Sequence, residues 1–172
     1  LVRGGRGVEA FAFGTRLTRI TPELRSCRPE DTLRAASARV VDWAGGKVAA
    51  VCTDEPSESA WYDAWIGLLD LDSRTAERMH EPEWQLQCPC ISPGGRVAWI
   101  EGFASDRAVV SGTTHVLGIG PLAPELDVTW LGFAGEESLW YAGSRGSGCT
   151  YGVLRLDGPV EERQEHPFAD PA

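Results

Sequence analysis

The sequence predicts an all-β fold built of β-propeller blades, each a sheet of four antiparallel strands. Short apolar or alternating runs, such as VAWI at residues 97–100, follow one another and are separated by Gly, Pro, Asp and Ser. No segment has the spacing of a long amphipathic helix, and only residues 30–36 could form one or two helical turns. A hairpin pattern also recurs three times along the chain. These observations predict about three full blades and a partial one, as part of a larger propeller.

The repeated segment is a hairpin in which a Gly-bearing turn joins two apolar strands. WAGGKVAAV at residues 43–51 aligns with SPGGRVAWI at residues 92–100, and both align with FAGEESLWY at residues 133–141. The alignment brings three glycines to one turn position, where we expect a positive φ: Gly45, Gly94 and Gly135.

A polar loop, a third strand and a short fourth strand are expected after each hairpin. The third strands are predicted at residues 65–72, 114–120 and 151–158, and the fourth near 75–79, 121–126 and 159–164. The full blades are predicted at residues 37–82, 83–126 and 127–172, after a partial blade at residues 1–36 with strands at 8–13 and 16–21. Sheets this small bury both faces only by stacking, so the similarity favours a propeller. An antiparallel sandwich with coincidental similarity is the alternative.

Composition excludes several function classes. The balance of 16 Lys and Arg against 25 Asp and Glu gives a net charge of −9, so we expect no nucleic-acid partner. The longest uncharged run, residues 108–124, is too short and too polar to span a bilayer, and no signal peptide is visible. The chain begins at Leu1 and its single Met is Met79, so we expect a piece of a longer protein. Five irregularly spaced cysteines favour a reducing compartment, which predicts a cytoplasmic location.

Residues 92–100 carry a resemblance to known propellers. SPGGRVAWI resembles the Ser-Pro-Asp-Gly-Arg hairpin of TolB-type propellers, which recurs in the N-terminal propeller of the prolyl oligopeptidase and acylaminoacyl-peptidase family. The stretches at residues 83–86, 101–107 and 127–143 look more like the peptidase propellers. The resemblance covers roughly residues 39–165, with Gly94 where the family usually has Asp.

In that family the propeller is not catalytic. It caps an α/β-hydrolase domain, restricts access to the active site, and precedes the domain that carries the Ser-Asp-His residues. The resemblance therefore implies a non-catalytic region that gates substrate access and docks a hydrolase domain or further blades. A stand-alone TolB-like scaffold for protein–protein binding is the alternative.

Charged residues in the loops after the second strands are the candidate binding residues. They would orient a peptide substrate or hold a neighbouring domain, with Arg pairing a carboxylate through two parallel hydrogen bonds. A solvated surface is the alternative for all of them. The candidates are Asp54, Glu55, Asp106, Arg107 and Arg145.

No catalytic, metal or cofactor site is predicted. GSRGSG at residues 143–148 does not match the Gly-x-Ser-x-Gly spacing of a hydrolase nucleophile and is expected to be a loop. Strand alternation sends Cys88 and Cys90 to the same face, but no His or second Cys pair has ligand spacing to them, so we expect strand thiols. Pro89 between them indicates a strand edge or a bulge. His115 is expected to be packed or to face solvent.

Overall fold

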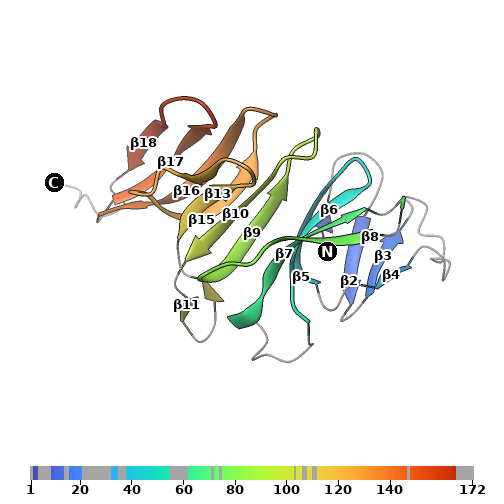
Figure 1. The fold of residues 1–172 in the computed structure, drawn as a ribbon. Helices are drawn as coiled ribbons and strands as arrows, with labels where there is room; N and C mark the ends of the chain where they lie inside the picture. The colour runs from blue at the N-terminus through green and yellow to red at the C-terminus, as the bar shows by residue number, and fades with distance from the viewer. Residues whose placement is uncertain are drawn as a thin grey trace.

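The computed structural model describes residues 2–3, 9–13, 16–20, 32–34, 38–54, 62–70, 72–73, 75–102, 104–105, 108–109, 112–146 and 148–165. All the helices and strands named in this part of the chain are strands, so the predicted all-β fold is confirmed. Figure 1 shows successive sheets that follow the order of the sequence, from the blue N-terminal region to the red C-terminal one. None of the described segments is a helix with the length and apolar character needed to cross a bilayer.

The strands form four antiparallel sheets of four strands, which we call blades 1 to 4. Blade 1 contains β1 (Val2–Arg3), β2 (Glu9–Phe13), β3 (Arg16–Ile20) and β4 (Thr32–Arg34). Blade 2 contains β5 (Ala38–Ala44), β6 (Lys47–Cys52), β7 (Trp65–Asp70) and β8 (Thr75–His80). Blade 3 contains β9 (Gln85–Ile91), β10 (Val97–Gly102), β13 (Thr113–Val116) and β14 (Gly120–Leu122). Blade 4 contains β15 (Asp127–Phe133), β16 (Ser138–Arg145), β17 (Gly148–Arg155) and β18 (Glu161–Glu165). A small hairpin of β11 (Ala104–Ser105) and β12 (Ala108–Val109) branches from blade 3.

Blade 1 differs from the sequence prediction. Two strands were expected there, and the structure adds the short β1 and β4 on either side of them. Residues 30–36 are the only segment in which the sequence allows a helical turn, and the part of it that the structure describes, Thr32–Arg34, is a strand that pairs with β3. An isolated helical turn orders several residues for one hydrogen bond, whereas a strand gains a ladder at once.

Blades 2, 3 and 4 pack face to face through two apolar clusters. The first combines small or branched residues of blade 2 with residues of blade 3: Ala49, Val51, Ala64 and Ile66 with Leu86, Ile91, Val97 and Trp99. The second combines blade 3 with blade 4: Cys90, Ala98, Ile100 and Val116 with Leu126, Val128, Leu131, Leu139, Tyr141 and Leu154. Each blade thus covers a face that its neighbour would otherwise expose to water. The Ile91 N–H also donates a 2.9 Å hydrogen bond to Asp42 Oδ2 across the first of these boundaries.

The turn glycines follow the prediction only in part. Gly45 and Gly135 have positive φ, at 55° and 149°. The expectation for Gly94 is wrong, because Gly95 takes the positive φ, at 92°. Ser92 folds this turn by accepting hydrogen bonds at its carbonyl from Gly95 and at its hydroxyl from the Arg96 N–H. Gly46, which the alignment pairs with Gly95, also has a positive φ, at 82°, so the second glycine of the turn is left-handed in both hairpins.

Blade 4 is out of register with the repeat alignment by one residue. The first pair after the turn is Val97–Ile91 in blade 3 and Leu139–Phe133 in blade 4. Leu139 therefore occupies the place of Val97, whereas the alignment pairs it with Ala98. Because side chains alternate along a strand, a shift of one residue exchanges the two faces.

Candidate functional site

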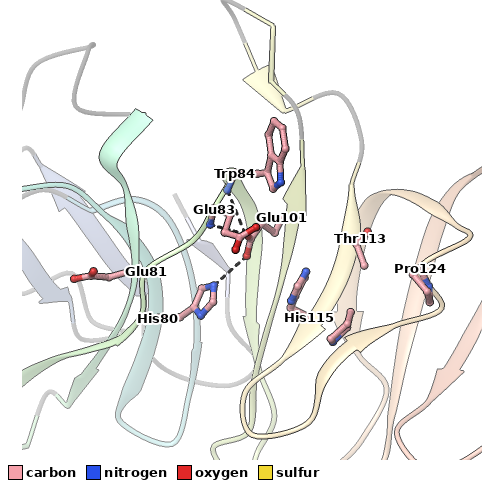
Figure 2. A pocket seen from close by; sticks show the side chains of 9 residues that line it. His80, Glu81, Glu83, Trp84, Glu101, Thr113, His115 and Pro124 are labelled. Atoms are coloured by element: carbon pink, nitrogen blue, oxygen red, sulfur yellow. Dashed lines mark hydrogen bonds and ion pairs between the residues drawn. The ribbon is translucent and has the colours of Figure 1, made fainter.

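A pocket of about 500 Å³ opens where the segment from β8 to β9 passes over blade 3 (Figure 2). We call it the interblade pocket. Its lining combines imidazoles, carboxylates, an indole and two prolines: His80, Glu81, Glu83, Trp84, Glu101, Thr113, His115, Pro121 and Pro124.

The floor of the interblade pocket is one face of blade 3. Strands β10 and β13 are antiparallel, and their register pairs Trp99 with His115 and Glu101 with Thr113. Paired residues point to the same face of a sheet, and residues two apart along a strand do so as well. These four side chains therefore share the face that also packs against blade 2. Pro121 pairs with His115 and extends the same face onto β14.

Glu101 holds the wall of the pocket to its floor. One carboxylate oxygen accepts hydrogen bonds from the backbone N–H groups of Glu83 (2.9 Å) and Trp84 (3.2 Å). The other accepts from Trp99 Nε1 (3.4 Å) and contacts His80 Nε2 at 3.0 Å. Figure 2 shows Glu101 reaching toward the β8–β9 segment from the strand below. Only 7% of the residue is exposed, so these contacts replace nearly all of its hydration.

Glu101 is ionised in this setting. Burial by itself raises the pKa of its carboxyl, but the contacts with His80, the Glu83 N–H, Trp99 and the Trp84 N–H together hold that pKa below its usual range. A fixed negative charge therefore lies at the base of the interblade pocket.

Three aromatic rings surround this carboxylate. Trp99 lies 4.7 Å from His80 and 5.7 Å from His115 between ring centroids, and it stacks on His115 with an interplanar angle of 14°. Burial lowers the pKa of His115, and nearby His80 lowers it further, against the opposing effect of Glu101. A neutral imidazole keeps one nitrogen as a hydrogen-bond acceptor.

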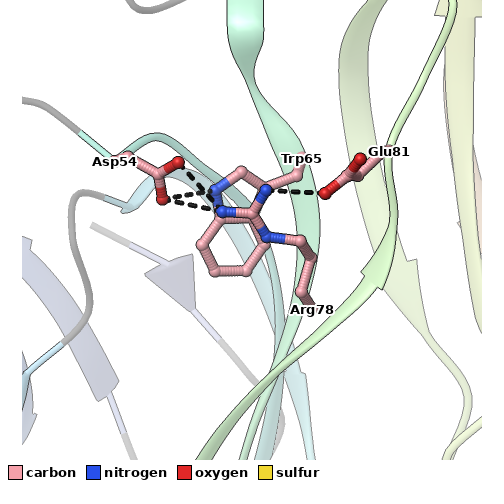
Figure 3. A network of polar contacts seen from close by, with 4 residues as sticks. All are labelled: Asp54, Trp65, Arg78 and Glu81. Atoms are coloured by element: carbon pink, nitrogen blue, oxygen red, sulfur yellow. Dashed lines mark hydrogen bonds and ion pairs between the residues drawn. The ribbon is translucent and has the colours of Figure 1, made fainter.

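An ion-pair network borders the pocket at Glu81. The Arg78 guanidinium lies over the Trp65 ring at 4.5 Å from its centroid. It donates to both carboxylate oxygens of Asp54, at 2.8 and 2.9 Å, and to Glu81 at 2.7 Å. Figure 3 shows Asp54 and Glu81 binding Arg78 from opposite sides. Trp65 Nε1 also donates to Asp54, so the network ties β6, β7 and β8 together.

The sequence-predicted site residues are only partly described. Asp54 lies just after β6 in the Arg78 network, and Arg145 ends β16 and forms a 3.2 Å ion pair with Glu125. Asp54 belongs to blade 2 and Arg145 to blade 4, so the structure assigns them to different local networks. Glu55, Asp106 and Arg107 lie outside the described residues.

Sequence reasoning missed His80 and Glu101 as members of one cluster. A signal for Glu101 was present, because it follows VAWI with the same alternation as Val97 and Trp99, which places it on the buried face. Nothing local marks His80, since its partner is on the next blade.

The Cys88-Pro89-Cys90 segment lies at a bulge, as predicted. The register of β9 and β10 shifts opposite Trp99, and Cys88 adopts a positive φ of 48°. Both thiols pack against the cluster between blades 3 and 4, and burial raises the pKa of each. No group of three or more His, Cys, Asp or Glu residues in the described part of the chain could hold a metal ion.

The segment at residues 143–148, expected to be a loop, is mostly strand. It ends β16 and begins β17, with Gly146 in the turn at a φ of 61°. Eight consecutive residue pairs join these two strands, so little of the segment is available for a loop. The hydrogen-bonded ladder outweighs the low strand propensity of Gly and Ser.

Comparisons with known proteins identify the fold but assign the chain to no family. No family model matches the sequence, and no curated protein matches it either. TolB from Acinetobacter baumannii is similar in structure, with a TM-score of 0.61 and 15% identity over 90% of this chain and 40% of TolB. The β-propeller domain of the Trilobed protease from Pyrococcus furiosus gives a TM-score of 0.55 and 17% identity over 76% of this chain and 43% of that one.

A chain in the structure of a nidogen/laminin complex is also similar, with a TM-score of 0.53 and 12% identity. It is matched over 92% of this chain and 60% of its own length. This chain thus spans less than two thirds of each of these proteins. At such identities the likeness establishes the fold alone, and it agrees with the predicted β-propeller.

Proposed function

We propose that this chain is the non-catalytic propeller region of a prolyl-oligopeptidase-like serine peptidase. Its roles would be to limit substrate access and to dock the α/β-hydrolase domain. The observation that carries the proposal is the outward face of blade 4, the face turned away from blade 3. A reducing, cytoplasmic setting is part of the proposal, because the four described cysteines are free thiols.

The outward face of blade 4 has the composition of a contact surface. Trp130 and Trp140 are 52% and 53% exposed, and Tyr151 is 39% exposed. The register places them on one face, since Trp130 pairs with Ala142 and Ala142 pairs with Tyr151. The equivalent faces of blades 2 and 3 are covered by the next blade. A contiguous aromatic face of this kind indicates a partner, which we propose to be a further blade or the hydrolase domain.

Two further observations support a peptidase over other propeller proteins. The SPGGRVAWI hairpin and the stretches around it resemble the peptidase propellers more than other TolB-type propellers. One of the similar structures is itself the propeller domain of a protease.

A TolB-like scaffold that binds protein partners is the second candidate. The structural likeness to TolB, at a TM-score of 0.61, favours it. In this case the outward face of blade 4 would still meet a further blade, but the complete protein would contain no hydrolase domain.

Labelling with a fluorophosphonate probe tests the proposal. The complete protein that contains this chain should react at one serine, and peptide mapping should place that serine C-terminal to residue 172. The isolated chain should neither react nor cleave aminoacyl or acylaminoacyl chromogenic substrates. Heat-denatured protein is the control for non-specific labelling. An unlabelled complete protein would favour the scaffold, and a labelled serine within residues 1–172 would contradict both candidates.

Size selectivity tests the gating role. In the complete protein, not treated with the probe, a disulfide engineered across two neighbouring blades should slow cleavage of long peptides more than cleavage of a small chromogenic substrate. Reduction of that disulfide should restore the rate. Equal slowing of both substrates would contradict gating by the propeller.

A further inference from the structure

We propose that the interblade pocket binds the cationic side chain, arginine or lysine, of a basic peptide segment. The inference goes beyond the proposed function, because the pocket is formed within this chain and needs neither a hydrolase domain nor a further blade. Three features carry it: the charge of the lining, the acceptors on the floor and the aromatic surface around them.

The charge of the lining favours a cation. The pocket is lined by three carboxylates and by no Lys or Arg. Glu81 is already paired with Arg78, and Figure 2 shows it pointing away from Glu101. Glu101 and Glu83 therefore supply the negative charge, within a chain of net charge −9. A concave site of one sign concentrates ligands of the opposite sign.

The acceptors on the floor suit a donor-rich group. Each carboxylate oxygen of Glu101 already has two contacts, so Glu101 contributes a fixed negative charge rather than a free hydrogen-bond acceptor. His115 and Thr113 lie beside it on β13 and offer a neutral imidazole nitrogen and a hydroxyl oxygen. Guanidinium and ammonium groups carry only donors, so these acceptors match them.

The aromatic surface adds a second attraction. Trp84 lines the pocket and is 57% exposed, and His115 stacks on the buried Trp99. A cation is drawn to the face of an aromatic ring, and arginine also stacks on one. The same carboxylates would repel an anionic ligand. The cation we propose is molecular, because the aromatic surface suits an organic cation and no group of three or more His, Cys, Asp or Glu residues in the described part of the chain could hold a metal ion.

The volume indicates a side chain with part of its backbone. About 500 Å³ is within the range of roughly 300–1,000 Å³ that ligand pockets occupy, and it exceeds what one side chain fills. Pro121 and Pro124 form an apolar border on the β14 side, where a neighbouring peptide residue could pack.

Titration of the whole chain with matched peptides tests the proposal. The probe is Ac-Ala-Arg-Ala-amide, and its citrulline analogue has nearly the same shape without the charge. Calorimetry should show the arginine peptide binding about tenfold more tightly than the citrulline peptide. NMR should show the largest shifts at the rings of His115 and Trp84. Free guanidinium ion tests whether the pocket prefers a small free cation to a peptide side chain, and it should bind more weakly than the peptide.

Variants assign the binding to the pocket. Glu83→Gln removes one charge from an exposed side chain and should weaken the arginine peptide about three- to tenfold. His115→Phe keeps the ring stack but removes the acceptor, and it should weaken binding by a similar factor. Glu77→Gln is the matched control, because Glu77 is an exposed carboxylate on β8 outside the pocket. Four results would each overturn the proposal. Two concern the arginine peptide itself: an equal loss of affinity in Glu77→Gln and Glu83→Gln, or no saturable binding in the millimolar range. The other two concern the comparison ligands: equal affinity for the citrulline peptide, or tighter binding of free guanidinium ion than of the arginine peptide.

Discussion

The Glu136 carboxylate of blade 4 accepts a 2.7 Å hydrogen bond from the Ser92 hydroxyl in the turn of blade 3. Its other oxygen accepts a 2.5 Å hydrogen bond from the Gly94 N–H. A Cβ atom at position 94 would lie only 2.6 Å from Glu136 Oε2. The propellers that this chain resembles usually carry Asp at that position. Here the neighbouring blade supplies the carboxylate, which couples the turn to the boundary between blades.

Gly94→Asp is therefore expected to destabilise the chain, although it restores the residue that the resembling propellers carry. The new side chain meets the Glu136 carboxylate and brings a like charge beside it. Denaturant unfolding should show a loss of about 1–3 kcal/mol.

A double variant separates this mechanism from a general effect of replacing glycine. Glu136→Ala alone should cost about 1 kcal/mol by leaving the Ser92 and Gly94 donors without this partner. Gly94→Asp combined with Glu136→Ala should be more stable than the sum of the two losses predicts, because the clash and repulsion are gone. Additive losses would show that Glu136 is not the cause.

Glu101→Gln is expected to weaken the attachment of the β8–β9 segment to blade 3. The amide keeps one acceptor for the backbone N–H groups but turns a donor toward Trp99 and His80. Loss of charged, nearly buried hydrogen bonds should lower the free energy of unfolding by about 2–3 kcal/mol, whereas Glu77→Gln should change it by less than about 0.5 kcal/mol. Similar changes for the two variants would contradict a structural role for Glu101.

Acid should remove the contribution of Glu101. Its pKa is lowered in the folded state, so above about 4.5, the usual value, the ionised form favours folding in full. As the pH falls below that value the unfolded chain binds the proton first, and the stabilisation is lost. Unfolding measured from pH 6 down to pH 3 should show a shallower decline in Glu101→Gln than in the parent chain. An unchanged decline would place the acid sensitivity elsewhere.

His115 should also make the stability fall on acidification, in a pH range above that of Glu101. Its folded pKa lies below the usual value of 6.5, so the unfolded chain takes up the proton first as the pH falls through 6.5. Stability should therefore drop below that pH, and the NMR titration of His115 should have its midpoint under 6.5. His115→Phe should remove this part of the pH dependence. Glu101 and His80 face the ring, so a midpoint above 6.5 would mean that the Glu101 charge dominates over burial.

The fold could be predicted from the sequence because its signal is local and repeated. Short apolar runs at regular intervals define the strands, and the repetition of a hairpin indicates stacked sheets. The register of blade 4 could not be predicted in this way. The turns of blades 3 and 4 each place five residues between the first paired residues, but the glycines that the alignment superposes, Gly94 and Gly135, lie at different steps of these turns. Leu139 therefore takes the place of Val97 and is buried.

The interblade pocket was beyond sequence reasoning for a different reason. Glu101 and His80 are separated by 21 residues and lie on different blades. Their meeting depends on how blade 3 packs against blade 2, and no local spacing encodes that packing. The loop residues chosen from the sequence were selected for charge, and Asp54 and Arg145 each have an ion-pair partner in the structure.

The register shift makes the tryptophans that the alignment pairs, Trp99 and Trp140, differ in burial. Trp99 is 2% exposed between blades 2 and 3, whereas Trp140 is 53% exposed on the outward face of blade 4. Trp99→Ala should therefore cost about 3–5 kcal/mol of unfolding free energy, because it leaves a cavity in the core. Trp140→Ala should change the stability of this chain by less than about 0.5 kcal/mol. In the complete protein Trp140→Ala should cost more, because we propose that another blade or the hydrolase domain covers it. An equal, small effect of Trp140→Ala in both contexts would mean that this face stays in water and would remove the main support for the proposed partner.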